Sequence, residues 1–336
     1  MFEWGGGLYI RPIEEFPYLI HRMREVAHHP RWERFGETHR SLIARVLREV
    51  ERRGPLGSRD LGGGSRVSSY RARTDTGLAL YYLWHTGKLV IHGRSGSQRV
   101  YDLTSRTILP KFLKPVPSGE AREHLAWISL RRFGLASMSE VHSSLHWIYP
   151  NGHSPRMTKD WIALREARGE LARVEVDGWA RSSWTDPDAM AQLEGLERDE
   201  SPEGWAPRSS TTEEAATFLA PLDVVCTAGR ARRLFNFEYI WDVYVPESRR
   251  RWGYYTLPIL HGENLRGRAD LRYDRPSGVL KVLGFWFESP ADGSDRRYAA
   301  AVGRGLAALR DMTGARRIDV GGMQPTGFRS RVVSAM

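Results

Sequence analysis

The chain has 336 residues, 41% of them hydrophobic, which is enough to build two or three cores and excludes a disordered protein. Its formal net charge of +10 at pH 7 favours an anionic partner such as nucleic acid. Nearly all the basic residues are arginines, which suit phosphates and base edges, although a GC-rich genome produces the same bias.

Residues 1–37 begin with side chains of the kind found in protein cores. Phe2, Trp4 and Tyr9 lie in the first ten residues, and an ordered domain seldom starts on such a run without a packing partner before it. Apolar residues then recur at helical spacing from Ile13 to Ala27. We interpret residues 1–37 as the remnant of an N-terminal winged helix.

Residues 38–117 have the plan of a winged helix. Helices are predicted at residues 38–52, where Thr38 is the cap, from residue 58, and at residues 74–85. Residues 89–103 then predict a β-hairpin whose tip carries Arg94 and Arg99. Three helices followed by a two-stranded wing is a DNA-binding arrangement in which the third helix can enter the major groove.

An approximate repeat of this plan follows about 80 residues later and strengthens both interpretations. Within residues 118–182, helices are predicted at 119–133 and 158–167, and a second wing at 171–178 turns at Asp177-Gly178. The chain therefore predicts at least two tandem winged helices. Such tandems also serve as protein-protein modules, so this alternative stays open.

The rest of the chain predicts a linker followed by a β-rich domain, which makes the fold class α+β. Residues 183–213 are rich in Asp, Glu, Ser and Pro and indicate a linker with one short helix. Residues 214–336 carry at least four strands, which favour a small β-barrel or a strongly curved sheet. A closing helix is predicted at 295–310, and residues 325–336 are expected to be loose.

The region from Arg249 to Arg275 predicts a β-hairpin with one cationic face. Tyr254 and Tyr255 belong to the apolar entering strand and are interpreted as core residues. On the returning strand, every second residue is polar, namely Arg266, Arg268, Asp270 and Arg272. The candidate DNA-backbone contacts are therefore the arginines of this strand and of the first wing: Arg94, Arg99, Arg266, Arg268 and Arg272.

Signatures of cofactor and metal chemistry are mostly missing from the sequence. Gly62-Gly63-Gly64 lacks the Lys-Ser or Lys-Thr of a phosphate-binding loop and is interpreted as a plain loop. His142 and His146 lie one helical turn apart, but no acidic residue or cysteine lies near them, so neither a metal nor a cofactor is predicted. Asp223 and Asp270 are the acids of interest, and a structural salt bridge with an arginine is expected for each.

The sequence favours the cytoplasm. Cys226 is the only cysteine, which excludes disulfides within the chain, and it is expected to be a small core residue. No apolar run approaches the roughly 20 residues of a membrane span, and the N-terminus lacks the form of a signal peptide. The oligomeric state stays open.

Several sequence blocks resemble the YcaQ-like family of bacterial winged-helix DNA glycosylases, which includes enzymes for alkylated purines and for DNA interstrand crosslinks. They occur in the family's order across nearly the whole chain: Phe2-Glu3-Trp4 with Pro12; Gly54-Pro55-Leu56; Arg99-Val100-Tyr101-Asp102-Leu103; Leu219-Ala220-Pro221-Leu222-Asp223; Arg233-Leu234-Phe235 with Phe237 and Tyr239; Tyr244-Val245-Pro246; Arg250 with Gly253-Tyr254-Tyr255 and Leu257-Pro258-Ile259-Leu260; and Gly267-Arg268-Ala269-Asp270. The resemblance implies tandem winged helices, a small β-barrel and a concave basic face that holds duplex DNA.

The sequence departs from this family at the site where the family's catalytic residues are expected. The family's motif, Gln-aliphatic-Gln or Gln-aliphatic-Asp, lies upstream of the Phe-Glu-Trp block, where this chain begins. The only glutamines are Gln98, Gln192 and Gln324, and Gln192-Leu193-Glu194 mimics the motif only within the predicted linker. Gly5-Gly6-Gly7 replaces the family's histidine-bearing stretch. We therefore expect the catalytic segment to be missing and assign no catalytic residue.

The resemblance implies a DNA-binding protein for alkylpurine or crosslink repair, with double-stranded DNA, alkylated or crosslinked, as its partner. A form with the glutamine motif would hydrolyse the N-glycosidic bond of an alkylated purine, and this chain is expected to be inactive. An N7-alkylated purine is already a good leaving group, so the protein need only orient water and stabilise a cationic sugar. The alternative is a non-enzymatic winged-helix transcriptional regulator or scaffold.

Overall fold

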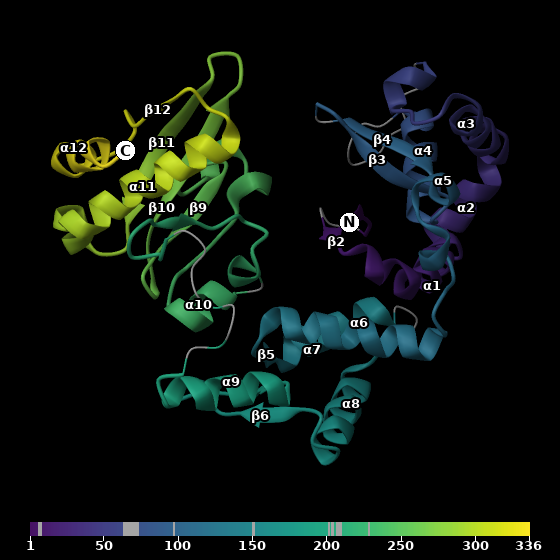
Figure 1. Ribbon diagram of the computed structural model, residues 1–336, viewed down its shortest axis with the longest axis horizontal. Helices are drawn as coiled ribbons and strands as arrows, with labels where there is room; N and C mark the ends of the chain where they lie inside the picture. The colour runs from purple at the N-terminus through teal and green to yellow at the C-terminus, as the bar shows by residue number, and fades with distance from the viewer. Residues whose placement is uncertain are drawn as a thin grey trace. The chain divides into compact units, whose positions relative to one another are not determined.

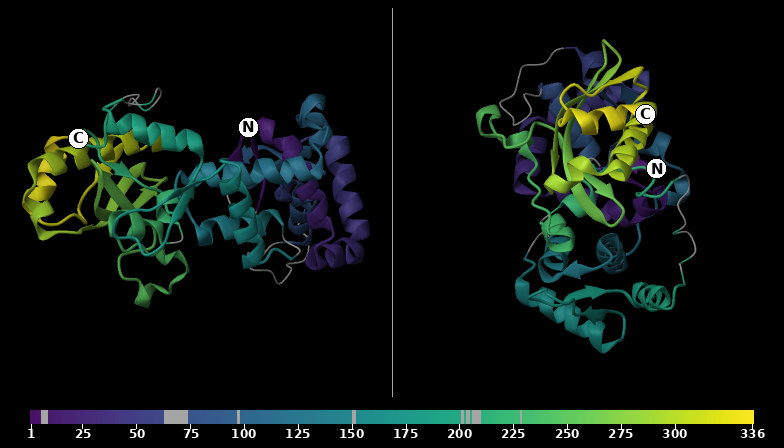
Figure 2. Two further views of the ribbon diagram at one scale, coloured as in Figure 1. Left: turned by 90° about the horizontal axis from the view of Figure 1, so that it is seen from below. Right: turned by 90° about the vertical axis from the view of Figure 1, so that its left-hand side faces the viewer.

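A computed structural model describes residues 1–5, 9–62, 74–96, 98–149, 152–200, 202, 205, 210–227 and 229–336 (Figures 1 and 2). The chain forms two compact units. Unit 1 comprises Met1–Val174 and Ser182–Asp186, and unit 2 comprises Glu175–Arg181 and Pro187–Met336. The predictions made for Gly6, Gly7, Gly63 and Gly64 fall outside the described residues.

The N-terminal residues of unit 1 pack against other parts of the unit. They form β1 (Phe2–Glu3), β2 (Ile10–Arg11), η1 (Ile13–Glu15), α1 (Phe16–Ala27) and α2 (Pro30–Thr38). Trp4 is 2% exposed, and its Nε1 donates a hydrogen bond to the carbonyl of His85 at 3.1 Å, while Nε1 of Trp84 donates to the carbonyl of Glu3 at 2.9 Å. The expectation that Phe2 and Trp4 lack a partner is therefore wrong; only Tyr9 is exposed.

The next elements lie where the sequence predicted them. They are α3 (Arg40–Arg53), η2 (Ser58–Leu61), α4 (Asp75–His85), β3 (Leu89–Ser95) and β4 (Gln98–Leu103), and the two strands pair antiparallel. Thr74 caps α4 by accepting from the amide of Gly77. Thr38 is not the cap of α3 as predicted, because its hydroxyl donates to the carbonyl of Arg34 at the end of α2.

Helix α4 has no exposed residue, so its entry into a DNA groove stays a prediction that this burial disfavours. Leu80, Leu83 and Trp84 are fully or nearly fully buried, and the remaining residues of the helix are at least partly covered. Helix α3, strand β3 and η2 pack around α4, and the Glu3-Trp4 segment is hydrogen-bonded to its C-terminal end. A helix with no fully exposed residue offers little surface for reading base edges.

The second group of elements in unit 1 repeats the helical plan. It comprises α5 (Thr104–Thr107), η3 (Pro110–Phe112), α6 (Ser118–Phe133), β5 (Ala136–Ser137), α7 (Met138–Ile148), α8 (Pro155–Ala167), β6 (Ala172–Val174) and β7 (Ser183–Thr185). Ser137 and Glu140 form a capping box that starts α7. The predicted turn occurs at Asp177-Gly178, where Gly178 has a φ of +79°.

Strand β7 lies at the start of the stretch expected to be a linker. It pairs with both β5 and β6 and is therefore the middle strand of a three-stranded sheet. Its three residues are all buried, with Ser183 1% exposed. A polar composition around residue 183 concealed this strand, because three residues are too few to show alternation.

One hydrophobic core runs through unit 1, from Phe2 to Trp184. Helix α1 packs against α6, α3 packs against α4, and α6 packs against α7. The sequence predicted boundaries at residues 37/38 and 117/118. Because one core joins all three parts, the structure does not separate them, and these boundaries stay a prediction.

Unit 2 is built on an open five-stranded sheet. Its elements are α9 (Pro187–Glu197), β8 (Thr217–Phe218), η4 (Val224–Cys226), α10 (Arg230–Phe235), η5 (Asp242–Tyr244), η6 (Glu247–Arg249), β9 (Thr256–His261), β10 (Asn264–Asp274), β11 (Val279–Phe287), η7 (Pro290–Ser294), α11 (Arg296–Thr313), β12 (Arg317–Asp319) and α12 (Thr326–Ser334). The strand order is β8-β9-β10-β11-β12, and only β12 is parallel to its neighbour. Among the described residues β8 and β12 are edges, so the predicted small β-barrel or strongly curved sheet is an open half-barrel.

Helices α11 and α12 cover one face of this sheet (Figure 1). Asp295 caps α11 by accepting hydrogen bonds from the amides of Arg297 and Tyr298. Helix α11 is the closing helix that the sequence predicted at residues 295–310. Phe328 and Val332 of α12 are fully buried against α11 and the sheet. The expectation that residues 325–336 are loose is therefore wrong.

The other face of the sheet is covered as well. Ala231 of α10, Phe237 and Leu265 form a second buried cluster with Tyr239 and Leu260 beside it. Strand β10 is consequently buried on both faces from Gly267 to Leu271. The predicted exposed cationic face along β10 is wrong over these residues, because a layer from α10 and the segment after it lies on top of that face.

Candidate nucleic-acid interface

The two arginines of the first hairpin meet the Phe-Glu-Trp block. Arg94 Nη2 donates to Glu3 Oε2 at 2.6 Å, and Arg99 donates to Glu3 Oε1. The guanidinium of Arg99 also lies over the ring of Trp84, 4.7 Å from its centroid. The side chain of Arg99 is 14% exposed, whereas that of Arg94 is 44% exposed. Arg99 thus ties the hairpin to β1, and Arg94 keeps a surface open to solvent.

Arg268 lies inside unit 2 with only 2% of its surface exposed. Its guanidinium is between two aromatic rings, 4.2 Å from the centroid of Phe237 and 3.9 Å from that of Trp252. It donates to the Glu288 carboxylate and to the carbonyl of Glu238 at 2.8 Å. A buried cation with these partners is satisfied, and no part of it reaches a phosphate.

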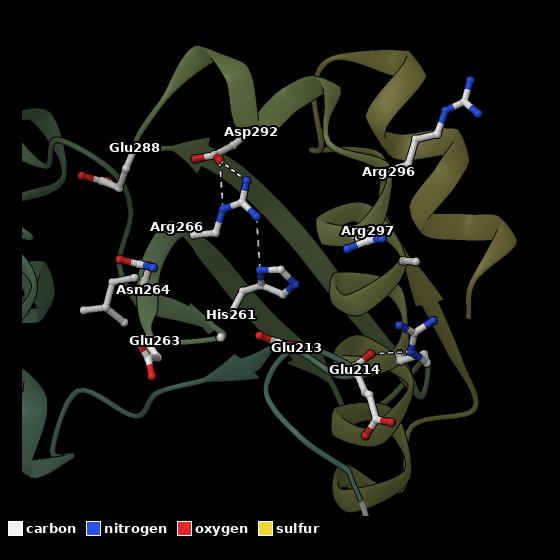
Figure 3. A pocket seen from close by; sticks show the side chains of 14 residues that line it. Glu213, Glu214, His261, Glu263, Asn264, Arg266, Glu288, Asp292, Arg296 and Arg297 are labelled. Atoms are coloured by element: carbon white, nitrogen blue, oxygen red, sulfur yellow. Dashed lines mark hydrogen bonds and ion pairs between the residues drawn. The ribbon is translucent and has the colours of Figure 1, made fainter. Parts of the chain in front are cut away.

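Arg266 lies in a pocket of about 900 Å³ at the β9–β10 turn (Figure 3). Its Nε donates to Asp292 Oδ1 at 2.9 Å and its Nη1 to Asp295 Oδ2 at 2.9 Å. Burial lowers the pKa of Arg266, but the hydrogen bonds that it donates to Asp292 and Asp295 outweigh burial and raise the pKa overall. Arg266 is therefore held as a cation that connects β10 to the start of α11.

His261 in this pocket is a neutral acceptor. Arg266 Nη1 lies 3.2 Å from its Nδ1, and a guanidinium only donates, so the ring proton must be on Nε2. Burial and the charge of Arg266 both lower the pKa of His261. Arginines line the pocket together with carboxylates, which are those of Glu213, Glu214, Glu263 and Glu288, among others (Figure 3). Such a mixed lining does not favour a polyanion.

A groove of about 740 Å³ lies at the opposite end of strands β9 and β10, and it contains Arg272. Tyr254 and Tyr255 line it and are 51% and 41% exposed. Their interpretation as core residues is wrong, because β9 begins only at Thr256 and the two tyrosines precede it on the surface. This groove brings together Arg250, Tyr254 and Tyr255 of one family block and Asp270 of another.

Backbone contacts hold the groove in shape. Asp270 Oδ1 accepts a hydrogen bond from the amide of Tyr255 at 3.1 Å. A Cβ at Gly253 would overlap the Asp270 carboxylate, so any larger residue here would have to displace the Asp270 side chain. Asp270 is 7% exposed. The side chain of Asp223 caps η4 by accepting a hydrogen bond from the amide of Val225. Both acids thus bind backbone amides, and among the residues that the structure describes neither forms the predicted salt bridge with an arginine.

A β-bulge delivers an apolar side chain to the same groove. Asp270 pairs with Gly284 and Leu271 pairs with Val282, which leaves Leu283 without a partner in the register. Leu283 is 44% exposed and lines the groove. Bulges commonly re-aim a side chain in this way, and nothing in the sequence pattern of β11 marks it.

The positive charges of the groove come from Arg250 and Arg272. Arg250 lies over the ring of Tyr254, 4.9 Å from its centroid, and its Nε donates to the carbonyl of Val245. Arg272 is exposed, and within the described parts of the chain no carboxylate lies within ion-pair distance of it. The run of arginines followed by aromatic residues between residues 249 and 255 was a visible signal for this site.

The remaining candidates from the sequence do not assemble into a catalytic or metal site. His142 Nδ1 and His153 Nε2 each lie 2.8 Å from the Thr158 hydroxyl, and no group of three potential metal ligands occurs in the described ranges. Gln192 and Gln324 are exposed, and the amide of Gln98 contacts Ser58. No helix of the described chain is long and apolar enough to cross a membrane.

Comparison with known proteins gives the family. A family model described as "DNA glycosylase AlkZ-like" matches residues 4–312. The chain is also similar to the solved structure of the DNA glycosylase AlkZ from Streptomyces sahachiroi, with a TM-score of 0.53 and 18% sequence identity over 95% of this chain and 81% of that chain. At this identity the likeness shows a shared fold. The match to the family model confirms the resemblance seen in the sequence blocks, and the chain belongs to the AlkZ-like DNA glycosylase family.

Proposed function

We propose that this protein binds double-stranded DNA as part of the repair of alkylated or crosslinked purines in the cytoplasm. The observation that carries the proposal is the groove in which exposed Arg272 and half-buried Arg250 lie beside Tyr254 and Tyr255. Arg272 is exposed and has no carboxylate partner in the described part of the chain, so it can contact a phosphate, and the net charge of +10 favours the encounter.

Of the five arginines predicted as DNA contacts, Arg272 and Arg94 have the exposure that such a contact needs. Arg99, Arg266 and Arg268 are engaged by carboxylates, and their role is to hold the hairpin, the β9–β10 turn and the floor of the groove. The side chains of these three are at most 22% exposed, so a phosphate contact would first have to break a largely buried ion pair. Arg94 is also paired with Glu3, but 44% of its side chain is exposed. We therefore assign the backbone contacts to Arg94 and Arg272.

We further propose that residues 40–103 and 118–185 are tandem winged helices that differ in what they expose. In the first winged helix, α4 has no exposed residue, so we propose that the β3–β4 hairpin with Arg94 contacts the DNA. Helix α8 of the second has an outward face with Arg156 and Lys159. This exposed helix favours one second candidate function, a regulator that reads a DNA sequence through α8. A binding selection that returned a sharp sequence motif would favour the regulator over the repair protein.

The reaction proposed for the family fold is hydrolysis of the N-glycosidic bond of an alkylated purine. The cationic base leaves readily, so one polar group that orients water is the minimum requirement. None of the three glutamines lines the groove or the Arg266 pocket, and the acids Asp223 and Asp270 are occupied by backbone amides. We therefore propose that the chain as given binds alkylated DNA but releases little base.

Two measurements on the same protein test this proposal. Fluorescence anisotropy with a labelled duplex across a salt series should show strongly salt-dependent binding, and chromatography should detect little N7-methylguanine released from methylated DNA. Arg272→Gln should reduce the slope of log affinity against log salt by about one, whereas Arg296→Gln in the mixed-charge pocket should change it less. Salt-independent binding would contradict the DNA proposal, and rapid release of base would show that a catalytic group lies elsewhere in this chain.

A further inference from the structure

The groove contains more aromatic surface than a phosphate contact needs. Tyr254 and Tyr255 are adjacent in sequence, line the same groove and expose 51% and 41% of their surface. Arginine alone can bind a phosphate, so two exposed rings beside it suggest a ligand with a flat apolar face. Leu283, delivered by the bulge in β11, adds a further apolar contact.

The two rings are held in place before any ligand arrives. The amide of Tyr255 is fixed by Asp270, and the ring of Tyr255 meets Trp241 edge to face at 6.4 Å. The ring of Tyr254 is covered on one side by the guanidinium of Arg250. Fixed rings lose little conformational entropy on binding, which favours stacking over a contact that first has to order the side chains.

The floor of the groove is also rigid. Trp252 lies between two guanidinium groups, 3.9 Å from that of Arg268 and 4.4 Å from that of Arg251. Arg268 is itself anchored to the Glu288 carboxylate and the Glu238 carbonyl. Buried Arg268 therefore acts as a support for the surface that the tyrosines form.

The charges in the groove fit a nucleotide. Its acids are Glu247 and Asp270, and the Asp270 carboxylate is occupied by the amide of Tyr255 and packed against Gly253. Arg272 is exposed at the rim, and the charge of Arg250 adds to it. A ligand with one flat ring and one negative charge matches this arrangement of rings and cations.

We infer that this groove binds an unpaired nucleotide, whose base stacks on Tyr254 or Tyr255 and whose phosphate meets Arg272. The inference rests on the proposed DNA binding and adds the class of DNA. Bases inside an intact duplex have both faces covered by their neighbours, so they cannot stack on a protein ring. The protein would therefore prefer DNA with single-stranded, frayed or bulged nucleotides.

A comparison of the protein's affinities for single-stranded and duplex DNA tests the inference. The full chain is titrated by fluorescence anisotropy with a labelled oligothymidine of about 20 nucleotides and with a blunt duplex of equal length. Replacing both rings, Tyr254→Leu with Tyr255→Leu, should weaken single-strand binding at least about tenfold and duplex binding less than about twofold. Tyr254→Phe with Tyr255→Phe keeps the rings and should retain single-strand binding.

The control variant is Tyr9→Leu, which removes a tyrosine of similar exposure, 47%, in unit 1 and should change neither affinity. Thermal melting checks that each variant is folded, and Tyr254→Leu alone replaces the double variant if that one unfolds. Equal losses for both DNA forms, or no loss at all, would overturn the inference while the duplex proposal stands. Failure of the wild-type protein to bind duplex DNA would instead refute the proposed function.

Discussion

Acidification should destabilise unit 1 through one residue, His85 at the end of α4. Its ring stacks on Tyr81 at 5.4 Å and on Trp4 at 5.5 Å, and it lies 5.9 Å from Trp32. Within the described structure its Nδ1 is buried and has no hydrogen-bond partner. Burial, reinforced by the charge of Arg22, lowers the pKa of His85 from 6.5 to about 4.

The sign and size of the effect follow from this pKa. A histidine whose folded pKa is lowered stabilises the fold fully above the unfolded pKa, and the stabilisation is lost as the pH falls toward the folded pKa. At about pH 5 the unfolded ring is protonated and the folded ring is not. Each pKa unit corresponds to about 1.4 kcal/mol, so between about pH 7.5 and 5 unit 1 should lose about 2 kcal/mol through His85.

The assay is urea unfolding at about pH 7.5 and 5, followed by the fluorescence of the tryptophans around His85. Burial also lowers the pKa values of His124 and His153, so these residues add to the pH dependence of stability. The informative quantity is therefore the difference between the wild type and His85→Asn, which cannot titrate. The variant should lose about 2 kcal/mol less over the same interval.

An independent measurement is the NMR titration of the His85 ring, which should have its midpoint near pH 4. A midpoint of about 6 or higher, or equal losses of stability in the wild type and the variant, would refute the reasoning. Either result would mean that water reaches the ring despite the aromatic residues around it.

Two further predictions concern unit 2, and each has its own readout. Gly305→Ala places a Cβ against the carbonyl oxygen of Ala216, so it should destabilise unit 2 by about 1–3 kcal/mol in urea unfolding. In the control Gly119→Ala in α6, the new Cβ has no other atom within 4 Å, so this change should be neutral or slightly stabilising. Equal effects of the two substitutions would disprove the close approach of α11 to Ala216. Burial, followed by the charge of Asp223, raises the pKa of the Cys226 thiol to about 12. At about pH 8 a disulfide reagent should therefore react with native Cys226 on the order of a thousandfold more slowly than with the unfolded chain, and equal rates would show an accessible thiolate.

Elements with strong local patterns were predictable from the sequence. Strand β11 is one of the strands predicted within residues 214–336, since apolar and β-branched residues run from Val279 to Phe287 and turn residues precede them. Helix α11 follows from the Asp295 cap and its apolar spacing. Helix α12 was missed although Phe328 and Val332 have the four-residue spacing of a buried helical face.

Burial that depends on distant segments was not predictable. The alternation along β10 placed Arg268 on a solvent face, and only Phe237 and Trp252 from outside that strand cover it. Helix α4 carries no local sign that the Glu3-Trp4 segment lies against its end. Conversely, Tyr254 and Tyr255 have core-like chemistry, and their exposure depends on where β9 begins.

The placement of β7 has a consequence for how the chain can be divided and made. A fragment that stops at residue 182, where composition indicates a boundary, would lack the middle strand between β5 and β6. During synthesis, unit 1 cannot complete this sheet until Thr185 has left the ribosome, by which time residues of unit 2 have already emerged. Expression of unit 1 alone should therefore extend at least to Asp186, and a protease cut between residues 174 and 182 would leave the later piece still paired into the sheet of unit 1.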